Sequence, residues 1–537
     1  MAVSSSIDPK NGFCRENCTF YSLHPPLLLP SPCIPLDITS YSFSLYPPSD
    51  SPAIIDASNG ARISHRELRS LVLSLSSSLQ HTLDIRKGDA VLILSSPSIY
   101  VPALYLAILS LGAIVTTSNP LSTESELEHQ IGISKPVLTF THFSLSHKTS
   151  TFRHRVIAID SPEFRELAVP SKPVRREAEI HQNDPATILY SSGTTGRVKG
   201  VLSSHLNYIA VVAGYKAEAE DRAAPPIALM TVPLFHIFGF FMVLKTVALG
   251  ETMVLMPKFE FSVLLRAVEK YRVTYMPVAP PLVVALAKAD EVLKYDLSSL
   301  ETIGSGGAPL GKGVIEKFAK RFPKVEVRQG YGLTESTGTA TRTTRLENKK
   351  HGSAGKLSAN IEARIVDPET NKPLAPGMRG ELWLRSPTNM KGYVGNAEAT
   401  AATLDHEGWL KTGDLCYIDD EGYLFVVDRL KELIKYKAYQ VPPAELEHLL
   451  LSHPEIADAA VIPYPDEEAG QIPMAFVVRR PGSSLSEKQV MEFIAKQVAP
   501  YKKIRKLSFV GSIPKSPAGK ILRKDLVAQA RSPASKL

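Results

Sequence analysis

The sequence is poor in cysteine and has no apolar run long enough to cross a membrane. None of its four cysteines has a matching pair of Cys or His residues at the spacing of a zinc site, so we expect reduced thiols. The most apolar stretch, residues 91–115, is interrupted by prolines and serines, whereas a membrane span needs about 20 mostly apolar residues. We interpret this stretch as a buried helix and strand of a large core. The cysteines are Cys14, Cys18, Cys33 and Cys416.

A secretory leader and a dense basic block are also missing. Residues 1–20 carry both signs of charge and contain no apolar segment of the kind that a signal peptide needs. The formal net charge is +7 over 537 residues, without a cluster of Lys and Arg. This balance disfavours binding to nucleic acid and suits small polyanionic ligands.

What the chain does contain is an alternation of short apolar runs with longer helical patterns. Residues 91–94 and 188–190 have the pattern of strands, and residues 126–131 and 262–271 have that of helices. The alternation predicts an α/β protein in which helices are layered on mostly parallel sheets. A chain of this length is expected to form two or more domains.

Domain boundaries are expected near residues 50 and 428. Residues 1–50 are rich in Pro and Ser and are predicted to form an extended arm that lies on a domain without joining its core. Residues 51–427 are predicted to form a large domain of several subdomains. The density of charge rises after Asp428, where we place a hinge to a small, mobile α+β domain of residues 428–537.

One segment has the composition of a phosphate-binding loop. Residues 190–200, with the sequence YSSGTTGRVKG, combine hydroxyls, three glycines and a lysine. Glycines let the backbone approach a ligand, hydroxyls and N–H groups bind phosphate oxygens, and Lys199 adds positive charge. The order of residues is not that of a Walker A loop. Apolar residues on both sides argue against a flexible linker.

Six further motifs follow this loop in order. They are VPLFHIF (232–238), GSGGAPL (304–310), QGYGLTE (329–335), GWLKTGD (408–414), DRLKELIKYK (428–437) and PKSPAGKILRK (514–524). Together with the loop they resemble the adenylate-forming superfamily, which includes acyl-CoA synthetases, plant 4-coumarate–CoA ligases, luciferases and adenylation domains of peptide synthetases. The chain is most similar to peroxisomal 4-coumarate–CoA ligase-like proteins of plants.

The resemblance implies a ligase that works in two steps. A carboxylic acid and ATP would form an acyl adenylate and pyrophosphate, and coenzyme A would then displace AMP to give an acyl-CoA. Thr334 would contact the α-phosphate and Glu335 would help to hold Mg²⁺. The residues implied for ATP and AMP are Ser191, Ser192, Gly193, Thr194, Thr195, Lys199, Gly307, Ala308, Pro309, Gln329, Gly330, Tyr331, Thr334, Asp414, Arg429 and Lys431.

The same resemblance assigns Lys520 to catalysis of the first step. Its ammonium would bond the attacking carboxylate and the α-phosphate and stabilise the transition state electrostatically. Taken alone, Lys520 is one of several lysines in its segment and would be interpreted as a solvated surface residue. A lone histidine among apolar residues is usually part of a core, but the family places His236 at the mouth of the acyl pocket, where it would gate access.

For the second step the resemblance implies that the small domain rotates about Asp428. Lys520 would leave the site, and the segment with Lys435 and Gln440 would enter it and form a channel for pantetheine. The residues implied for CoA contact are Lys258, Lys437 and Ala438. Ala438 stands where the family usually has Gly, so CoA transfer is the step in which this chain departs from the pattern.

The acyl pocket departs further from that of true 4-coumarate ligases. Phe238 stands where hydroxycinnamate ligases carry Tyr, and this change removes a hydroxyl that could bind a phenol. The substitutions favour an apolar acid, such as a fatty acid, a cyclopentane-ring oxylipin or a cinnamate without free hydroxyls. The residues expected in the pocket are His236, Phe238, Phe241, Met276, Gly304 and Gly332.

Two alternatives use the same ATP motifs: a luciferase-like oxygenase and a non-catalytic protein that holds an acyl adenylate. The intact Thr334, Glu335, Asp414 and Lys520 argue against the second. The tripeptide Ser535-Lys536-Leu537 matches a peroxisomal address. We therefore expect a peroxisomal location, with the import receptor, ATP, CoA and a small acid as partners, and no nucleic acid.

Overall fold

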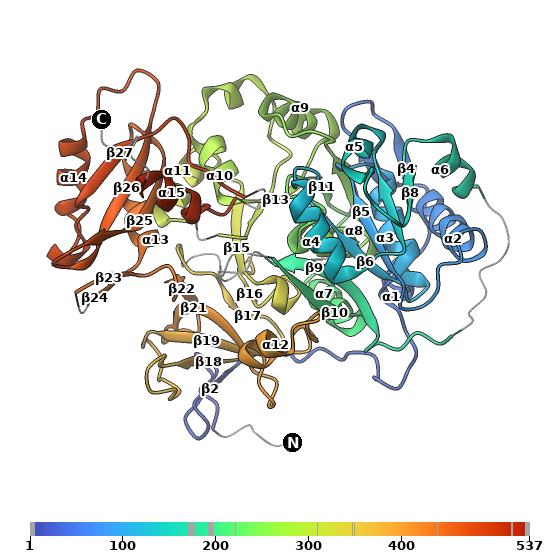
Figure 1. Ribbon diagram of the computed structural model, residues 1–537, viewed down its shortest axis with the longest axis horizontal. Helices are drawn as coiled ribbons and strands as arrows, with labels where there is room; N and C mark the ends of the chain where they lie inside the picture. The colour runs from blue at the N-terminus through green and yellow to red at the C-terminus, as the bar shows by residue number, and fades with distance from the viewer. Residues whose placement is uncertain are drawn as a thin grey trace.

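The computed structural model describes residues 6–169, 178–191, 198–220, 222–308, 310–345, 347, 350–437, 439–516 and 519–531. Within these ranges the chain builds four sheets and fifteen α-helices (Figure 1). Strands and helices alternate through most of the sequence, so the predicted α/β class is confirmed.

The largest sheet has nine strands. In spatial order they are β17 (Lys356–Leu357), β16 (Thr341–Arg342), β15 (Glu326–Tyr331), β14 (Thr302–Ser305), β13 (Tyr275–Val278), β11 (Ile227–Met230), β12 (Thr252–Leu255), β3 (Pro52–Asp56) and β4 (Arg62–Ser64). The strands from β15 to β3 run parallel. One face packs against α9 (Phe261–Tyr271), α10 (Pro280–Lys288) and α11 (Lys312–Arg321) in an apolar cluster. The predicted helix at residues 262–271 is confirmed as part of α9.

A second sheet has seven strands. In spatial order they are β20 (Gly392–Tyr393), β10 (Lys199–Ser204), β9 (Pro185–Ser191), β6 (Ile114–Thr117), β5 (Ala90–Leu94), β7 (Leu138–Thr141) and β8 (Arg155–Ala158). All five residues of β5 are buried, as expected for an apolar run in a parallel sheet that is covered on both faces. The strands predicted at residues 91–94 and 188–190 are confirmed within β5 and β9.

The main core lies between these two sheets. It is filled by α1 (Ile38–Leu45), α2 (His65–His81), α3 (Tyr100–Ser110), α7 (His205–Ala217) and α8 (Ile237–Ala248). Nearly every residue of α3 and of α8 is buried, because these helices have protein on all sides. The other helices of this region are α4 (Glu124–Ser134), which contains the predicted helix at residues 126–131, α5 (Ser146–Thr149), α6 (Pro162–Leu167) and α12 (Ala397–Thr403).

The third sheet is antiparallel and includes the N-terminal segment. Its strands are β1 (Phe13–Cys14), β2 (Thr19–Tyr21), β18 (Glu362–Val366), β19 (Gly380–Arg385), β21 (Leu410–Ile418) and β22 (Leu424–Arg429). Phe20 on β2 and Ile38 on α1 are fully buried. The prediction of an extended arm without core residues is therefore wrong for these parts of residues 1–50. The reason is that short apolar stretches between the prolines find partners far along the chain.

The C-terminal segment forms a lobe of its own, orange to red in Figure 1. Its sheet contains β23 (Ile434–Tyr436), β24 (Tyr439–Val441), β25 (Ile456–Asp466), β26 (Gly470–Arg479) and β27 (Lys506–Phe509). Its helices are α13 (Pro443–Ser452), α14 (Glu487–Ala495) and α15 (Arg523–Arg531). No helix in the described part of the chain is both long enough and apolar enough to span a bilayer.

Candidate active site

A cavity of about 820 Å³ lies where the C-terminal lobe meets the nine-stranded sheet. Its sheet side is formed by residues at or just after the carboxyl ends of β13, β14 and β15. This edge of a parallel sheet is where α/β proteins commonly bind their ligands. Its other side is formed by residues of the lobe, including Lys520. The lobe therefore completes the cavity.

Nine of the residues predicted for the site line this cavity. They come from segments that are far apart in the sequence and are Gly307, Ala308, Gln329, Gly330, Tyr331, Gly332, Asp414, Arg429 and Lys520. In the turn after β14, Gly307 and Ala308 line the cavity without a bulky side chain. A flat ring such as adenine could lie against it. Pro309, Ser192, Gly193, Thr194 and Thr195, also predicted for the site, lie outside the described residues.

Asp414 is held by two neighbours at the centre of the cavity. The Tyr331 hydroxyl donates a 2.6 Å hydrogen bond to Asp414 Oδ2, and Arg429 Nε lies 3.8 Å from Oδ1. Burial raises the pKa of Asp414, while Arg429 opposes the rise. The carboxyl group is thus fixed in orientation by a phenol and a guanidinium, and it can accept hydrogen bonds from vicinal hydroxyls.

Lys520 is carried by a tight turn that packs against the large part of the molecule. Ser516 N donates to Lys520 O at 2.7 Å, and Lys520 N donates to Ser516 Oγ at 3.2 Å. Gly519 has φ +81°, and a Cβ at this position would lie 3.0 Å from the Cβ of Ala279 at the start of α10. Glycine is therefore required both by the backbone conformation and by the close approach.

Charged groups from several segments surround the Lys520 ammonium. Burial is the main cause that lowers the pKa of Lys520, and Arg429 lowers it further, whereas Asp414 and Glu335 counteract the shift. Burial and the positive charge of Lys520 lower the pKa of His236 to about 3, so His236 is neutral at physiological pH. His236 caps α8, where its Nδ1 accepts a 3.3 Å hydrogen bond from Phe238 N.

A second polar group lies beside the loop that was predicted to bind phosphate. Glu335 accepts a 2.9 Å hydrogen bond from the hydroxyl of Tyr393, and the Lys199 ammonium lies 4.6 Å from the centre of the Tyr393 ring. Lys199 on β10 pairs with Ser191 on β9, so these two residues flank the predicted loop. The Ser191 hydroxyl is buried and has no hydrogen-bond partner among the described residues. Thr334, next to Glu335, is buried.

The residues predicted for the acyl pocket separate onto two faces of the nine-stranded sheet. Phe238 packs against the core between the sheets, and its ring stacks on that of Phe241 at 5.6 Å. Met276 is fully buried in the other cluster, against α9, α10 and α11. Its neighbour Tyr275 instead packs with Phe238, because successive side chains of a strand point to opposite faces.

The described residues among those predicted for CoA and for the second step do not line the cavity. Lys435 pairs with Gln440 across β23 and β24, and both are exposed. Lys437 follows β23 with φ +52°. Lys258 has 82% of its side chain exposed and forms a 3.0 Å ion pair with Glu260. Lys431 is also exposed, and Ala438 lies outside the described residues.

Two groups near the site were not found from the sequence. Tyr393 belongs to the short run Lys391-Gly392-Tyr393, whose glycine next to an aromatic residue is the sequence signal for a turn at this position. Arg523 on α15 binds Glu447 at 2.8 Å and also Glu432, so that one partly buried guanidinium joins three segments of the lobe. In the sequence Arg523 is a lone arginine among lysines, and this pattern does not predict the ion pairs that it forms.

Comparison with known proteins places the chain in a family. The model for the AMP-binding enzyme matches residues 45–394, and the model for the AMP-binding enzyme C-terminal domain matches residues 445–520. The peroxisomal OPC-8:0-CoA ligase 1 of Arabidopsis thaliana is 50% identical over 98% of this chain and 99% of its own. The 4-coumarate–CoA ligase-like 5 of Oryza sativa subsp. japonica is 50% identical over 99% and 98%, respectively.

A solved structure supports the same assignment. ATP-bound MatB from Rhodopseudomonas palustris superposes with a TM-score of 0.82 at 26% identity, covering 93% of this chain and 99% of that one. The chain therefore belongs to the AMP-binding enzyme family. Within this family it is an AMP-forming acid–CoA ligase of the 4-coumarate–CoA ligase-like group, with ATP and CoA as co-substrates. The predicted family, enzyme class and reaction are confirmed.

Proposed function

We propose that the chain joins a medium-sized, largely apolar carboxylic acid to CoA, with Lys520 as the catalytic cation of the adenylating step. The observation that carries this proposal is the meeting of Lys520, Asp414 and Arg429 at one cavity. A buried ammonium that lacks full hydration gains most when an anionic ligand arrives. The attacking carboxylate and the α-phosphate are such ligands, and their charge changes as the new bond forms.

The nucleotide is proposed to lie across the cavity. Asp414 accepts hydrogen bonds from the ribose hydroxyls, and Arg429 donates to the same sugar. Gly307 and Ala308 lie against the adenine, with Gln329, Gly330 and Tyr331 along its other side. Ser191 and Lys199, together with the loop between them, bind the β- and γ-phosphates. The Ser191 hydroxyl supports this assignment, because it has no hydrogen-bond partner in the part of the chain that the structure describes, and a buried hydroxyl without a partner is costly.

Mg²⁺ is proposed to bind at Glu335. Mg²⁺ in nucleotide sites is commonly held by one or two carboxylates and by the phosphates themselves. One oxygen of Glu335 accepts a hydrogen bond from Tyr393, which leaves the other oxygen available for the ion. When bound, Mg²⁺ neutralises charge on the phosphates. Thr334 then contacts the α-phosphate from the same turn.

The acid is proposed to enter past His236. At physiological pH His236 is neutral, so it adds no charge at the mouth of the acyl pocket. Phe238, Phe241, Gly304 and Gly332 provide apolar or small surfaces beyond it. These residues support a fatty acid, an oxylipin or a cinnamate-type acid as the substrate class. The name of the OPC-8:0-CoA ligase relative supports the oxylipin class.

CoA transfer is proposed to follow a rotation of the C-terminal lobe about Asp428. Asp428 accepts hydrogen bonds from its own neighbour Arg429 and from Ala444 N at the start of α13, so it joins β22 to the lobe. Rotation would withdraw Lys520 and bring in Lys435 and Gln440, with Lys258, Lys437 and Ala438 along the path of pantetheine. The exposure of Lys435 and Gln440 in the present arrangement supports this exchange.

The protein is proposed to act in peroxisomes. The tripeptide Ser535-Lys536-Leu537 and the peroxisomal relative support this location. A fluorescent fusion that preserves the tripeptide should enter peroxisomes, and removal of Leu537 should leave it in the cytosol. Import that persists without Leu537 would contradict the role of the tripeptide.

The proposed function is tested with one panel of acids. The purified protein is incubated with ATP, Mg²⁺ and CoA and with cinnamates, fatty acids or oxylipins, and the acyl-CoA mass, AMP and pyrophosphate are measured. Thioester and AMP should appear in equal amounts with at least one apolar class. Light emission or peroxide chemistry without consumption of CoA would instead support an oxygenase.

A further inference from the structure

Helix α10 contacts the C-terminal lobe at both of its ends. At its start, the turn with Lys520 packs so closely that a Cβ at Gly519 would lie 3.0 Å from the Cβ of Ala279. At its last residue, Lys288 Nζ donates a 3.0 Å hydrogen bond to the carbonyl oxygen of Ile456, the first residue of β25. A helix of nine residues is about 13 Å long. The two contacts are therefore well separated, and together they fix the orientation of the lobe.

Helix α11 contributes a second lysine to the same contact with the lobe. Lys317 Nζ donates a 3.1 Å hydrogen bond to the carbonyl oxygen of Ser452, the last residue of α13. The last carbonyls of a helix have no partner within it and form the negative end of its dipole, so an ammonium group is favourable there. At the start of α11, a Cβ at Gly311 would lie 3.3 Å from His448 Cγ on α13. Helices α10 and α11 thus form a docking platform for the lobe.

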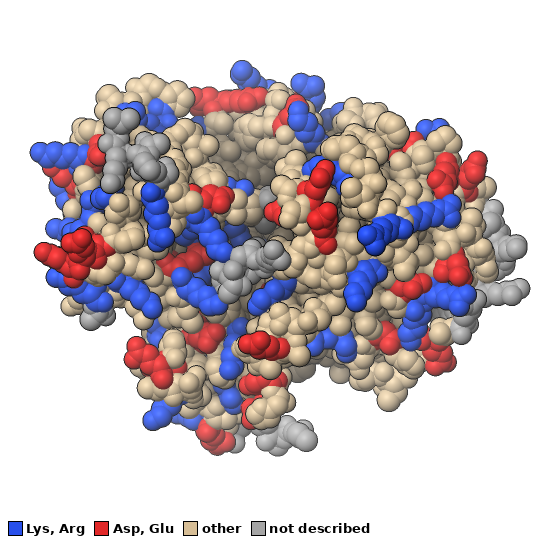
Figure 2. Space-filling view, in the orientation of Figure 1, with Lys and Arg blue, Asp and Glu red and all other residues tan. Residues whose placement is uncertain are grey.

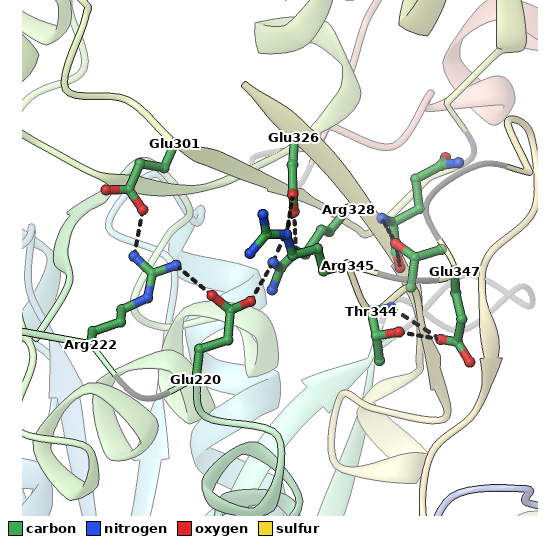
Figure 3. Close-up of polar contacts among 10 residues, drawn as sticks. Glu220, Arg222, Glu301, Glu326, Arg328, Thr344, Arg345 and Glu347 are labelled. Atoms are coloured by element: carbon green, nitrogen blue, oxygen red, sulfur yellow. Dashed lines mark hydrogen bonds and ion pairs between the residues drawn. The ribbon is translucent and has the colours of Figure 1, made fainter. Parts of the chain in front are cut away.

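The docking platform is anchored to the nine-stranded sheet by ion pairs. Helix α10 is followed by β14 and α11 by β15, and Glu301 and Glu326 stand at the starts of these strands. Arg328 lies 2.9 Å from both Glu220 and Glu326 (Figure 3). Arg222 pairs with Glu220 at 3.1 Å and also with Glu301 (Figure 3). These ion pairs tie both strands to the segment after α7, so the docking platform can keep its place when the lobe moves.

The bonds from the docking platform to the lobe are suited to release. Their acceptors are backbone carbonyls, which hold an ammonium less tightly than a carboxylate does. Burial lowers the pKa of Lys288 to about 8, and the charges of Arg480 and Lys317 contribute to the decrease. Asp458 opposes the decrease but is itself paired with Lys515 at 2.6 Å. The Lys288 ammonium thus gives up hydration when the lobe docks and regains it on release, so the net gain from docking is moderate.

We propose that Lys288 and Lys317 are positioning residues that hold the lobe in the arrangement with Lys520 at the cavity and thereby set the balance between the two steps. The pair is called the lysine latch below. The inference rests on the proposed rotation of the lobe about Asp428 and names residues that control it. The lysine latch favours adenylate formation, and it has to open before the hairpin of β23 and β24 can reach the cavity.

A weaker lysine latch should change the ratio of the two rates. Each rate is proportional to the population of the arrangement that performs the step, so their ratio follows the equilibrium between the two arrangements. Weakening the latch lowers adenylate formation or raises thioester formation, depending on which arrangement predominates. A general loss of folded protein would instead lower both rates together and leave their ratio unchanged.

The test measures both steps in the full-length protein. Adenylate formation is followed by pyrophosphate release, and thioester formation by the acyl-CoA mass obtained from preformed acyl adenylate and CoA. Lys288→Met keeps the apolar stem and loses the ammonium, and the ratio of thioester to adenylate rate should rise about tenfold. In Lys317→Met the rise should be about twofold, because Lys317 is exposed. Lys320→Met, at another exposed lysine of α11, is the matched control and should leave the ratio unchanged.

Two further readouts separate the lysine latch from other roles of Lys288. Lys288 lines the cavity, so a direct contact with the nucleotide would raise the KM for ATP, which should instead stay within about twofold in Lys288→Met. The position of the lobe is measured by pulsed electron spin resonance between spin labels on Lys324→Cys and Glu487→Cys, in protein that also carries Cys18→Ser and Cys33→Ser. Lys288→Met should lower the population at the label distance of the docked lobe.

An unchanged ratio in Lys288→Met, or label distances equal to those of the protein with Lys288, would overturn the proposal. A ratio that rises equally in Lys320→Met would ascribe the effect to net charge and would also contradict the lysine latch. If the protein with Lys288 releases no pyrophosphate with any acid, the ligase function is refuted, and the label distances alone decide whether Lys288 holds the lobe.

Discussion

The turn that carries Lys520 and the hairpin of β23 and β24 belong to the same lobe but have opposite surroundings. The turn is docked against α10 and lines the cavity, whereas Lys435 and Gln440 of the hairpin are exposed. In this arrangement the lobe presents the turn with Lys520 to the cavity and leaves the hairpin with Lys435 and Gln440 outside it. This difference is the one that the proposed rotation of the lobe requires, because the hairpin can reach the cavity only when the turn leaves it.

Replacement of Lys520 should have the largest effect and should separate the two steps. Lys520→Ala is expected to lower the rate of adenylate formation about 10²–10³-fold, because an electrostatic contact to the transition state is lost. Thioester formation from preformed acyl adenylate should stay within about threefold, because the proposed rotation would hold Lys520 outside the site in that step. Pyrophosphate release and thioester mass are measured separately. Lys524→Ala, at an exposed lysine of the same segment, is the control, and equal loss of both steps would contradict the exchange.

The next largest effect is expected at the cluster of Arg523, Glu447 and Glu432, which joins three segments of the lobe. Burial raises the pKa of Glu447 to about 7 from an ordinary value of 4.5, while Arg523 opposes the rise. A carboxyl group whose pKa is higher in the folded state than in the unfolded state holds its proton more tightly when the protein is folded. Its contribution to the free energy of unfolding is complete below about pH 4.5 and is lost as the pH rises through about 7. The free energy of unfolding of the lobe should therefore fall over this interval by up to about 3 kcal/mol.

Glu447→Gln should remove most of this decrease in the free energy of unfolding with pH. Denaturant unfolding at about pH 5 and about pH 8 measures it, with the exposed Glu492→Gln on α14 as the matched variant. A slope that is unchanged in Glu447→Gln would show that Glu447 does not titrate in this interval.

Substitutions in the hairpin of β23 and β24 should impair the second step and spare the first, which is the reverse of the result expected for Lys520→Ala. Lys435→Ala and Gln440→Ala are each expected to lower thioester formation about tenfold, which corresponds to the loss of one or two hydrogen bonds near a charge. Adenylate formation should change little. The readouts are the same pyrophosphate and thioester measurements, with the exposed Lys488→Ala on α14 as control. A fall in adenylate formation of equal size would place the hairpin in the first step as well.

The smallest effect is expected at Lys258. Its ammonium is exposed and already paired with Glu260, so its contribution to binding CoA is screened by solvent. Lys258→Ala should raise the KM for CoA about twofold to threefold without changing the KM for ATP. A larger rise would mean that the lobe, once rotated, shields this lysine from water.

The sequence predicted the site best where ordered motifs combine with glycine and charge. Gly307, Asp414 and Lys520 were assigned from three separate motifs, and the fold brings them to one cavity. The mixed charges of the surface were also as expected from the modest net charge, since Lys, Arg, Asp and Glu are interspersed over the face in Figure 2. Neither result required knowledge of strand register.

The sequence predicted less where the outcome depends on which face a residue occupies. Met276 was expected in the acyl pocket, but it packs against α9–α11, while Tyr275 beside it packs against the core between the two large sheets. A shift of one residue along a strand reverses the face, and the apolar character of β13 does not reveal it.

The pairing of β2 with β18 has a consequence for the order of events during protein synthesis. Tyr21 pairs with Glu362, about 340 residues further along the chain. At translation rates of about 5–20 residues per second, Phe20 leaves the ribosome about 20 to 70 s before its partner strand exists. During that interval its aromatic surface lacks its native partner and is available to chaperones.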